Sequence, residues 1–137
     1  MNRINDKINE INKYLKELAN IIPDKLEEYK SNNLVKAACE RYFEKIVEGV
    51  TDVAFIVIAK KKFKIPEDDI DAFRILLEHE IINEGLYKKL KDAKGMRNIM
   101  AHQYGSVDDE IVFNSITEDI NNDIKNFIKA IRKIKNI

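Results

Sequence analysis

Hydrophobic residues recur along most of the chain every three or four positions, the spacing that places them on one face of an α-helix. The first stretch predicts a helix over residues 2–21, which Pro23 would end because proline lacks the backbone N–H of a helical residue. A short helix over residues 24–30 follows. The polar triplet at residues 31–33 then predicts a turn that includes a helix-capping side chain.

The next stretch predicts the longest helix, over residues 34–60. Its first half has one apolar face, whereas residues 53–59 are apolar all round. A strand is the competing prediction for this run because β-branched residues are frequent in it, but the helical spacing enters it without a turn residue. A helix that is apolar on every side must be covered on every side, and a small bundle has limited material for this. We therefore expect a second subunit to contact this helix.

Polar segments separate the predicted helices of the second half. Residues 66–69 form a loop that leads into a helix over residues 70–80. Asn83 is placed to cap the following helix, which Gly105 would end. Residues 108–109, both Asp, open the last helix, whose apolar positions recur to the end of the chain.

With only four Gly and two Pro among 137 residues, the chain has few helix breakers. We predict an all-α fold, an antiparallel bundle of four to six helices in one domain over residues 1–137, which pairs with a second copy as a homodimer. Cys39 is the only cysteine, so no internal disulfide can form and a cytoplasmic location is expected. No apolar run approaches the roughly 18 residues that cross a bilayer, and no apolar signal-peptide core follows Met1, so no membrane association is expected.

The formal net charge is zero, with 24 basic and 24 acidic residues, so no global field indicates a nucleic-acid-binding protein. The basic residues are unevenly distributed, because residues 88–97 and residues 125–135 each hold five of them. Two interpretations stay open for these segments. They are solvated helix faces with cations near a helix C-terminus, or they are surfaces for a phosphate-bearing ligand.

The most informative segment is residues 97–104, Arg-Asn-Ile-Met-Ala-His-Gln-Tyr. Arg97 is a permanent cation, His102 titrates near neutral pH, and Tyr104 carries a phenolic hydroxyl. A site that binds or cleaves a phosphodiester needs groups of this kind. Arg97 would hold a phosphate oxygen, His102 would give a proton to the leaving group, and Tyr104 would hold the 2′-hydroxyl or the leaving oxygen. Asn98, one turn before His102, would fix the imidazole through a hydrogen bond.

The helical repeat sets a geometric condition on this site. Arg97 and Tyr104 point in nearly the same direction on an ideal helix, but His102 lies about 140° from Arg97. A straight helix in one subunit therefore does not unite the three side chains. Either the helix unwinds after Ala101, or a second copy of the chain supplies the missing group across a twofold axis.

Other candidate residues have simpler explanations. His79, between two glutamates, is expected to be a solvated helix residue, and Cys39 a small buried hydrophobe. Four acids recur every fourth residue, as a metal-binding helix face would have them, but both histidines lie far away in sequence and no metal site is expected. These acids are Glu40, Glu44, Glu48 and Asp52. The chain has no Gly-rich phosphate-binding loop, which argues against an ATPase or a GTPase, and no cofactor is expected.

The predicted order of helices and the motif at residues 97–104 together resemble the HepT-like branch of the HEPN superfamily over almost the whole chain. That branch is identified by Arg-x4-His-x-Tyr near the end of a helix, with Asn usually after the Arg, as Arg97-Asn98 shows here. Two further segments also resemble the residues usual in that branch. They are residues 38–41, which open the long helix, and residues 52–54 within it.

The resemblance implies an all-α, dimeric, metal-independent endoribonuclease that acts as the toxin of a toxin–antitoxin pair. Its catalytic residues would be Arg97 and His102. The implied antitoxin is a small nucleotidyltransferase of the MNT type, which neutralises the toxin by transferring AMP to the motif tyrosine, here Tyr104. An adenylate at that position would put bulk and negative charge beside Arg97, where an RNA phosphate would bind.

Three functional hypotheses follow from the sequence. The first is the toxin ribonuclease, with RNA as substrate and the nucleotidyltransferase as partner. The second is a non-catalytic nucleotide- or RNA-binding module in which the same residues hold phosphates. The third is a helical adaptor for the nucleotidyltransferase. The neutral net charge favours the second and third, whereas the presence of both Arg97 and His102 favours the first.

Overall fold

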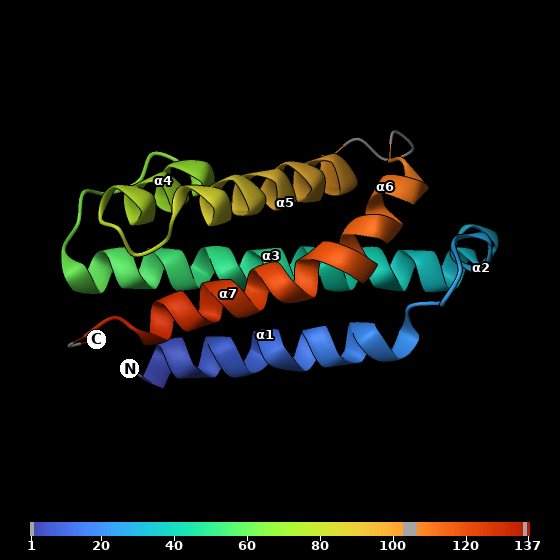
Figure 1. Ribbon diagram of the computed structural model, residues 1–137, viewed down its shortest axis with the longest axis horizontal. Helices are drawn as coiled ribbons and strands as arrows, with labels where there is room; N and C mark the ends of the chain where they lie inside the picture. The colour runs from blue at the N-terminus through green and yellow to red at the C-terminus, as the bar shows by residue number, and fades with distance from the viewer. Residues whose placement is uncertain (1, 103–106, 136) are drawn as a thin grey trace.

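The computed structural model describes residues 2–102, 107–135 and 137, and within these it is helical almost throughout (Figure 1). A π-helical segment, η1, joins α6 and α7 into one continuous helix, so the described residues form six helices. The elements in chain order are α1 (Asn2–Ile21), α2 (Leu26–Ser31), α3 (Asn33–Lys61), α4 (Asp69–Glu78), α5 (Glu84–His102), α6 (Asp109–Asn114), η1 (Ser115–Asp119) and α7 (Ile120–Arg132).

The long helix α3 lies at the centre of the bundle (Figure 1). It packs against α1 on one side and against α4 and α5 on another, and α7 contacts α5. The successive long helices α1, α3, α5 and α7 run in alternating directions along the long axis of the molecule (Figure 1). The predicted all-α antiparallel bundle is therefore confirmed. Within the described residues, no helix combines the length and the apolar character needed to span a membrane.

Side-chain caps fix the starts of four helices. The side-chain oxygen of Asn32 accepts a hydrogen bond from the backbone N–H of residue 35, and that of Asp68 accepts one from residue 71. Asn83 caps α5 in the same way through residue 86, and Asp108 caps α6 through residues 110 and 111. Short polar side chains at these positions satisfy N–H groups that have no partner inside the helix. The helix starts predicted from the sequence are therefore confirmed to within about two residues.

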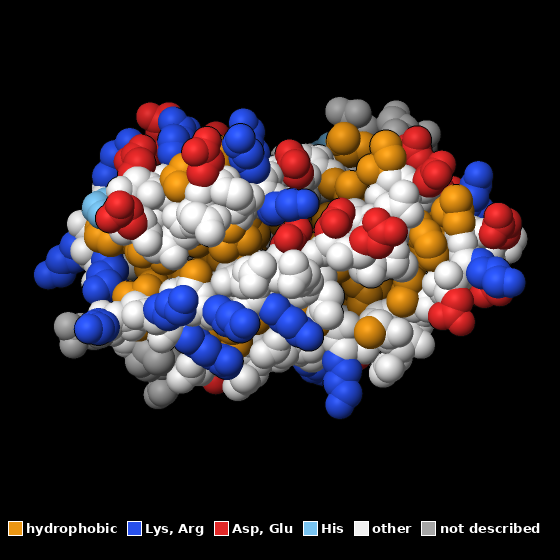
Figure 2. All heavy atoms as spheres, viewed as in Figure 1, with side chains coloured by type: hydrophobic (Ala, Val, Ile, Leu, Met, Phe, Trp, Pro, Cys, Tyr) orange, Lys and Arg blue, Asp and Glu red, His pale blue; other side chains and the backbone are white. Residues whose placement is uncertain are grey.

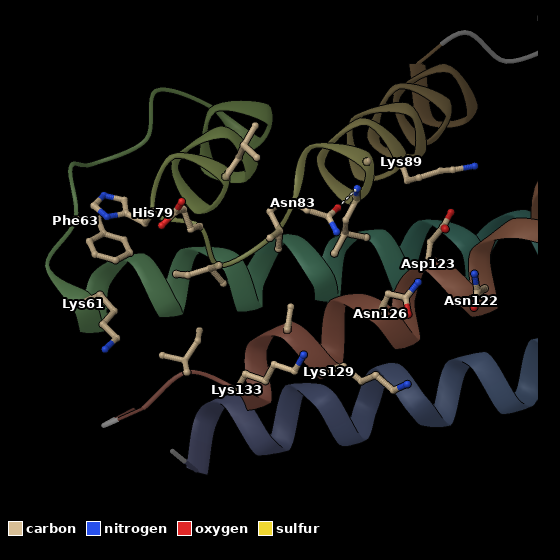
Figure 3. Close-up of a pocket in the computed structure, with 18 residues that line it drawn as sticks. Lys61, Phe63, His79, Asn83, Lys89, Asn122, Asp123, Asn126, Lys129 and Lys133 are labelled. Carbon is tan, nitrogen blue, oxygen red and sulfur yellow. Dashed lines mark hydrogen bonds between the residues drawn. The ribbon is translucent and has the colours of Figure 1, made fainter.

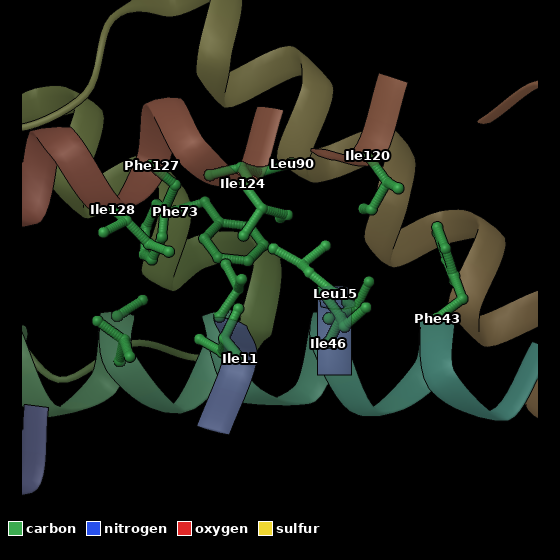
Figure 4. Close-up of a cluster of buried hydrophobic side chains, with 14 of the residues drawn as sticks. Ile11, Leu15, Phe43, Ile46, Phe73, Leu90, Ile120, Ile124, Phe127 and Ile128 are labelled. Atoms are coloured by element: carbon green, nitrogen blue, oxygen red, sulfur yellow. The ribbon is translucent and has the colours of Figure 1, made fainter. Parts of the chain in front are cut away.

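The apolar run at residues 53–59 is covered within a single chain. Val53, Ala54 and Val57 are fully buried, and Ala59 is the one exposed residue of the run. Side chains from α1, α4, α5 and α7 close over α3 (Figure 4). The apolar run therefore gives no separate reason to expect a second subunit, because α1, α4, α5 and α7 already cover α3, and the predicted homodimer stays a prediction.

The π-helical segment η1 was not predicted, and the spacing of apolar residues explains it. Three successive steps of four residues separate the buried side chains of Val112, Ile116, Ile120 and Ile124. Each such step advances the direction by about 40° beyond a full turn of an α-helix. A wider π turn removes part of this drift and keeps the four side chains on the core. The backbone N–H of Ile120 accordingly bonds to the carbonyl oxygen of Ser115, five residues earlier.

Candidate functional site

The predicted motif lies on the last turn of α5 and continues past the described residues. Leu90 and Met100 on α5 are buried, and the helix contacts α3, α4 and α7. This packing fixes the rotation of α5 about its own axis. The direction in which each motif side chain leaves the helix is therefore set by the fold.

Arg97 points toward α3 and forms an ion pair with Glu48. Its Nη2 lies 2.8 Å from Oε1 of Glu48, and the two side chains are 21% and 40% exposed. The Nε of Arg97 is buried and has no hydrogen-bond partner among the described residues. One edge of the guanidinium is thus held by a carboxylate. The group retains further N–H donors for a ligand, because arginine carries five of them.

Glu48 is a site residue that the sequence analysis assigned to a different pattern, the acids recurring every fourth residue. No local feature singles it out, because Glu44 and Asp52 lie one turn before and after it on α3. Its partner Arg97 is 49 positions away along the chain, so only the packing of α5 on α3 identifies Glu48.

His102 is the last residue of α5, and its side chain is exposed. The helical assignment reaches His102, and the approach to Gly105, where unwinding was predicted, lies outside the described residues. On the helical repeat, His102 leaves α5 about 140° from Arg97. Both predicted arrangements of the site therefore stay predictions.

The structure describes only one of the two supporting residues, Asn98, and not Tyr104. Asn98 is half-buried on α5, and no hydrogen bond joins it to His102 in the described part of the chain. The predicted amide–imidazole bond is therefore not formed. Tyr104 and Gly105 lie outside the described residues.

In the basic segment at residues 88–97, some of the cationic side chains are exposed to solvent and others are not. Lys94 is almost fully buried, and its Nζ lies 2.6 Å from Oδ2 of Asp69 at the start of α4. This pair fastens α5 to α4 and removes one of the five cations from the surface. Lys88, Lys89 and Lys91 are exposed.

An apolar hollow of about 530 Å³ lies beside the motif. Met96 and Ile99 line it from α5, and Ile111 lines it from α6. The side chains of Ile99 and Ile111 are 40% and 58% exposed. Gly95 also faces the hollow, and a Cβ added there would meet no atom within 4 Å. Exposed apolar surface beside a polar motif is typical of an interaction site.

The acids of α3 that were considered as metal ligands are partly committed to ion pairs. Glu44 lies 3.2 Å from Arg41, and Asp52 lies 3.1 Å from Lys7 of α1. Glu48 is held by Arg97. The described residues contain no group of three or more His, Cys, Asp or Glu side chains arranged to hold a metal ion.

Two further candidates are placed by the structure. Cys39 is buried as predicted, and burial, with a smaller contribution from Glu40, raises the pKa of its thiol to about 11. A thiol with that pKa stays protonated at neutral pH and is a poor nucleophile. His79 is exposed as expected, but it also stacks on Phe63, with ring centroids 3.6 Å apart and planes within 4°. It is therefore more than a solvated helix residue.

Comparison with solved structures finds the same fold in several proteins. The chain superposes on the tri-AMPylated Shewanella oneidensis HEPN toxin, solved in complex with MNT antitoxin, with a TM-score of 0.90 at 24% identity, covering 96% of this chain and 97% of that one. A toxin–antitoxin structure with AMP-PNP gives 0.92 at 22%, covering 98% and 100%. The cytosolic protein YutE from Bacillus subtilis gives 0.80 at 18%, covering 96% and 87%. At these identities the likeness shows a HEPN-like fold.

Sequence comparison finds relatives that are described as nucleases. The tRNA nuclease HepT of Aphanizomenon flos-aquae is 25% identical over 114 residues, which cover 83% of this chain and 78% of the relative. The mRNA nuclease HepT of Shewanella oneidensis is 24% identical over 127 residues, covering 93% and 94%. A family model described as "Ribonuclease HepT-like" matches residues 11–131. That match spans the helices that build the bundle and the helix that carries Arg97 and His102, and on this basis the chain belongs to the HepT-like ribonuclease family.

Proposed function

We propose that this protein is a metal-independent endoribonuclease that acts as the toxin of a toxin–antitoxin pair. The observation that carries the proposal is the presence of both Arg97 and His102 in a chain of the HepT-like ribonuclease family. The pair of Arg97 with Glu48 supports it, because a guanidinium held along one edge is pre-oriented for a phosphate. The cation and the proton carrier both come from the protein, so the proposed reaction calls for no metal ion.

The proposed reaction is an intramolecular transesterification at one phosphodiester of the RNA strand. The 2′-oxygen attacks the adjacent phosphorus and gives up its proton to solvent water, and the bond from phosphorus to the 5′-oxygen breaks. His102 gives a proton to that leaving oxygen. Arg97 stabilises the additional negative charge on the five-coordinate phosphorus. The products are a 2′,3′-cyclic phosphate and a 5′-hydroxyl, and Tyr104 would hold the 2′-hydroxyl or the leaving oxygen.

The reactive site is proposed to form between two copies of the chain. On the helical repeat Arg97 and His102 leave α5 about 140° apart, which supports placing the two groups of one site on different chains. The apolar hollow beside the motif, with the exposed side chains of Ile99 and Ile111, offers a surface that a second copy would cover. A twofold axis there would pair Arg97 of each chain with His102 of the other.

Cleavage in the presence of EDTA is the first test of this function. Wild-type protein is expected to cut single-stranded RNA and to leave a cyclic phosphate, which mass spectrometry of the fragments identifies. His102→Ala should cut at least about 100-fold more slowly, because positioned proton transfer contributes at least that factor. His79→Ala supplies the matched control when the RNA has only about five nucleotides, since it removes the exposed imidazole of His79 far from the motif and so short an RNA makes contacts near the motif alone.

Equal cleavage by the wild type and His102→Ala would remove His102 from the reaction. Loss of activity in EDTA, restored by a divalent ion, would refute the metal-independent step. If wild-type protein binds RNA with no cleavage in either condition, the non-catalytic binding module is the better description. The formal net charge of zero is the observation that favours this second function.

The proposed control is transfer of AMP to Tyr104 by an MNT-type nucleotidyltransferase. The phenolic oxygen would attack the α-phosphorus of ATP, pyrophosphate would leave, and the phenol proton would be lost. The adenylate would add a negative charge and bulk seven residues from Arg97, on nearly the same side of an ideal helix. A structural neighbour of this chain is a tri-AMPylated HEPN toxin, which supports this form of control.

Incubation with ATP and the cognate nucleotidyltransferase is expected to add AMP mass to the peptide that contains Tyr104. Tyr104→Phe should stay unmodified, because phenylalanine has no oxygen to accept the phosphoryl group. Tyr87→Phe is the matched control, since Tyr87 lies on the same helix outside the motif. Labelling of Tyr104→Phe at the wild-type level would refute the assignment of the modified residue and leave the nuclease assignment standing.

A further inference from the structure

A second hollow, here called the α7 groove, opens far from the motif, between the α4–α5 connection and α7 (Figure 3). Its volume is about 1310 Å³, more than twice that of the hollow beside the motif. Phe63 and His79 close one end of it, and Asn122 and Asp123 of α7 lie toward the other (Figure 3). No role proposed above uses these residues.

The α7 groove concentrates positive charge in a chain whose net charge is zero. Two acids, Glu80 and Asp123, face four lysines there, which are Lys61, Lys89, Lys129 and Lys133. Figure 2 shows Lys and Arg side chains in a row over the part of the surface where α7 runs.

Helix dipoles explain only part of this lysine set. Lys129 and Lys133 lie at the C-terminal end of α7, and Lys61 ends α3, where cations are favourable. Lys89 lies in the second turn of α5, near the positive end of that helix, where a cation is unfavourable. It faces the same groove as the other three lysines. Lys61 donates a hydrogen bond to the carbonyl oxygen of Lys135, and Lys89 acts electrostatically on Asp123. The case for an anionic ligand therefore rests mainly on Lys129 and Lys133.

Aromatic and amide side chains accompany the cations. The stacked rings of Phe63 and His79 line the groove and present a flat apolar surface at its end. Three amides, those of Asn83, Asn122 and Asn126, also line it. The oxygen of Asn83 caps α5, so its amide nitrogen is the part available to a ligand. Lysines with an aromatic platform and amides match a nucleic-acid strand, whose bases stack and carry hydrogen-bonding edges.

We propose that the α7 groove binds a single-stranded segment of the RNA substrate outside the cleavage site. The choice of RNA as the ligand rests on the proposed function. The lysines would contact phosphates, the Phe63–His79 stack would receive a base, and the asparagine amides would contact base edges. An acidic protein surface would use the lysines but would leave the stacked rings and the amides without a role.

The position of the groove predicts a dependence on RNA length. Lys89 and His102 are 13 residues apart on α5, which corresponds to about 20 Å along the helix. That distance is about six nucleotides for a strand stacked at 3.4 Å per step, and about three or four for an extended strand. An RNA of about five nucleotides that is cleaved near its middle has only two or three nucleotides on either side and does not reach the groove, whereas one of about 20 nucleotides does.

The test compares two double variants with the same loss of charge. Lys129→Gln/Lys133→Gln removes two exposed lysines of the groove, and Lys25→Gln/Lys30→Gln removes two exposed lysines at the α2 end of the molecule. Both are made in the His102→Ala chain so that RNA survives the measurement. Fluorescence anisotropy then follows binding of a labelled single-stranded RNA of about 20 nucleotides over a series of KCl concentrations.

The groove variant is expected to bind about tenfold more weakly at low salt than the α2 variant. Its plot of log K against log salt should be shallower by about 1.4, because each lost phosphate contact on a single strand contributes about 0.7. His79→Ala should weaken binding without changing that slope, since stacking releases no counterions. With His102 intact, cleavage of the RNA of about 20 nucleotides should fall, and cleavage of the five-nucleotide RNA should not.

Equal affinity and equal salt dependence in the two double variants would overturn the proposal. It would also be overturned if the groove variant kept its RNA affinity and lost the complex with the nucleotidyltransferase, since the groove would then be a protein-binding surface. If the wild type cleaves no RNA but binding still depends on Lys129 and Lys133, the α7 groove stands and the nuclease assignment fails.

Discussion

The ion pair of Arg97 with Glu48 fits the proposed role of Arg97 as the group that holds a phosphate. The pair is half-buried, with Nη2 and Oε1 2.8 Å apart, so solvent screens it less than a surface pair. Its main effect is directional, because the carboxylate holds one edge of a planar guanidinium and leaves other donors for a phosphate. We therefore regard Glu48 as a positioning residue for Arg97.

Replacing Glu48 with Gln is expected to lower both stability and turnover. The unfolding free energy should fall by about 0.5–1.5 kcal/mol, because the pair is partly exposed and its value is reduced accordingly. The rate constant kcat for RNA cleavage should fall about tenfold while KM stays unchanged or decreases, since a phosphate then meets a less oriented but unopposed cation. Urea denaturation and steady-state cleavage measure the two effects.

Glu44→Gln is the matched control for this variant. Glu44 lies one turn before Glu48 on α3 and pairs with Arg41, whose side chain is 60% exposed. We expect its kcat to equal that of the wild type and its stability to change by less than about 0.5 kcal/mol. Equal kcat in both variants would contradict a positioning role for Glu48.

At the scale of the helices, the contact between α1 and α3 is closest at Gly49. A Cβ built on Gly49 would lie 2.8 Å from Cγ1 of Ile11, which is fully buried on α1. The absence of a side chain is therefore what lets α1 approach α3. Gly95 on α5 is the opposite case, because a Cβ there would meet nothing within 4 Å.

These two glycines predict opposite effects of one substitution. Gly95→Ala should raise the unfolding free energy by about 0.5–1 kcal/mol, the gain for replacing glycine inside a helix. Gly49→Ala receives the same gain but forces Ile11 to move, so a net loss of about 1–2 kcal/mol is expected. Urea denaturation of both variants at one low protein concentration gives the comparison. A stabilised Gly49→Ala would mean that α1 yields to the new methyl group.

The helix starts could be read from the sequence because they depend on neighbouring residues alone. Asn32, Asp68, Asn83 and Asp108 each bond to a backbone N–H two or three positions ahead, and short polar residues before an apolar repeat predict this. The same local reasoning found the motif residues Arg97 and His102 and placed them on one helix.

Features that depend on packing could not be predicted in this way. The partner of Arg97 lies on another helix, 49 residues away. The cover over residues 53–59 comes from helices on either side of α3 in sequence, so the run did not need a second subunit. The α7 groove likewise combines residues of α3, α5 and α7 that no spacing rule connects. In each case the information is the relative placement of helices.

At the scale of the whole molecule, two surfaces of different character lie toward opposite ends of α5. The apolar hollow adjoins the motif near the C-terminal end, and the cationic α7 groove lies near the N-terminal end (Figures 1 and 3). A chain with zero net charge can thus present an apolar surface to a second copy and a basic surface to RNA. This separation lets dimer formation and RNA binding be tested independently.

The proposed site between two chains makes a quantitative prediction for mixed dimers. Arg97→Ala and His102→Ala are each expected to be inactive alone, because every site then lacks one group. When the two are unfolded together in equal amounts and refolded, about half of the dimers contain one chain of each kind. In such a dimer one site combines Arg97 of one chain with His102 of the other and is complete, while the second site lacks both groups. About a quarter of wild-type activity should therefore return.

The same mixture distinguishes this arrangement from a site within one chain. If Arg97 and His102 of a single chain acted together, every site in every mixed dimer would lack one of them, and mixing would restore nothing. Ile111→Lys provides the control, because it places a charge on a 58% exposed residue of the apolar hollow. Introduced into both variants, it should abolish the recovery and shift the molar mass measured by light scattering to that of a monomer. A mixture that stays inactive while its mass remains that of a dimer would contradict the shared site.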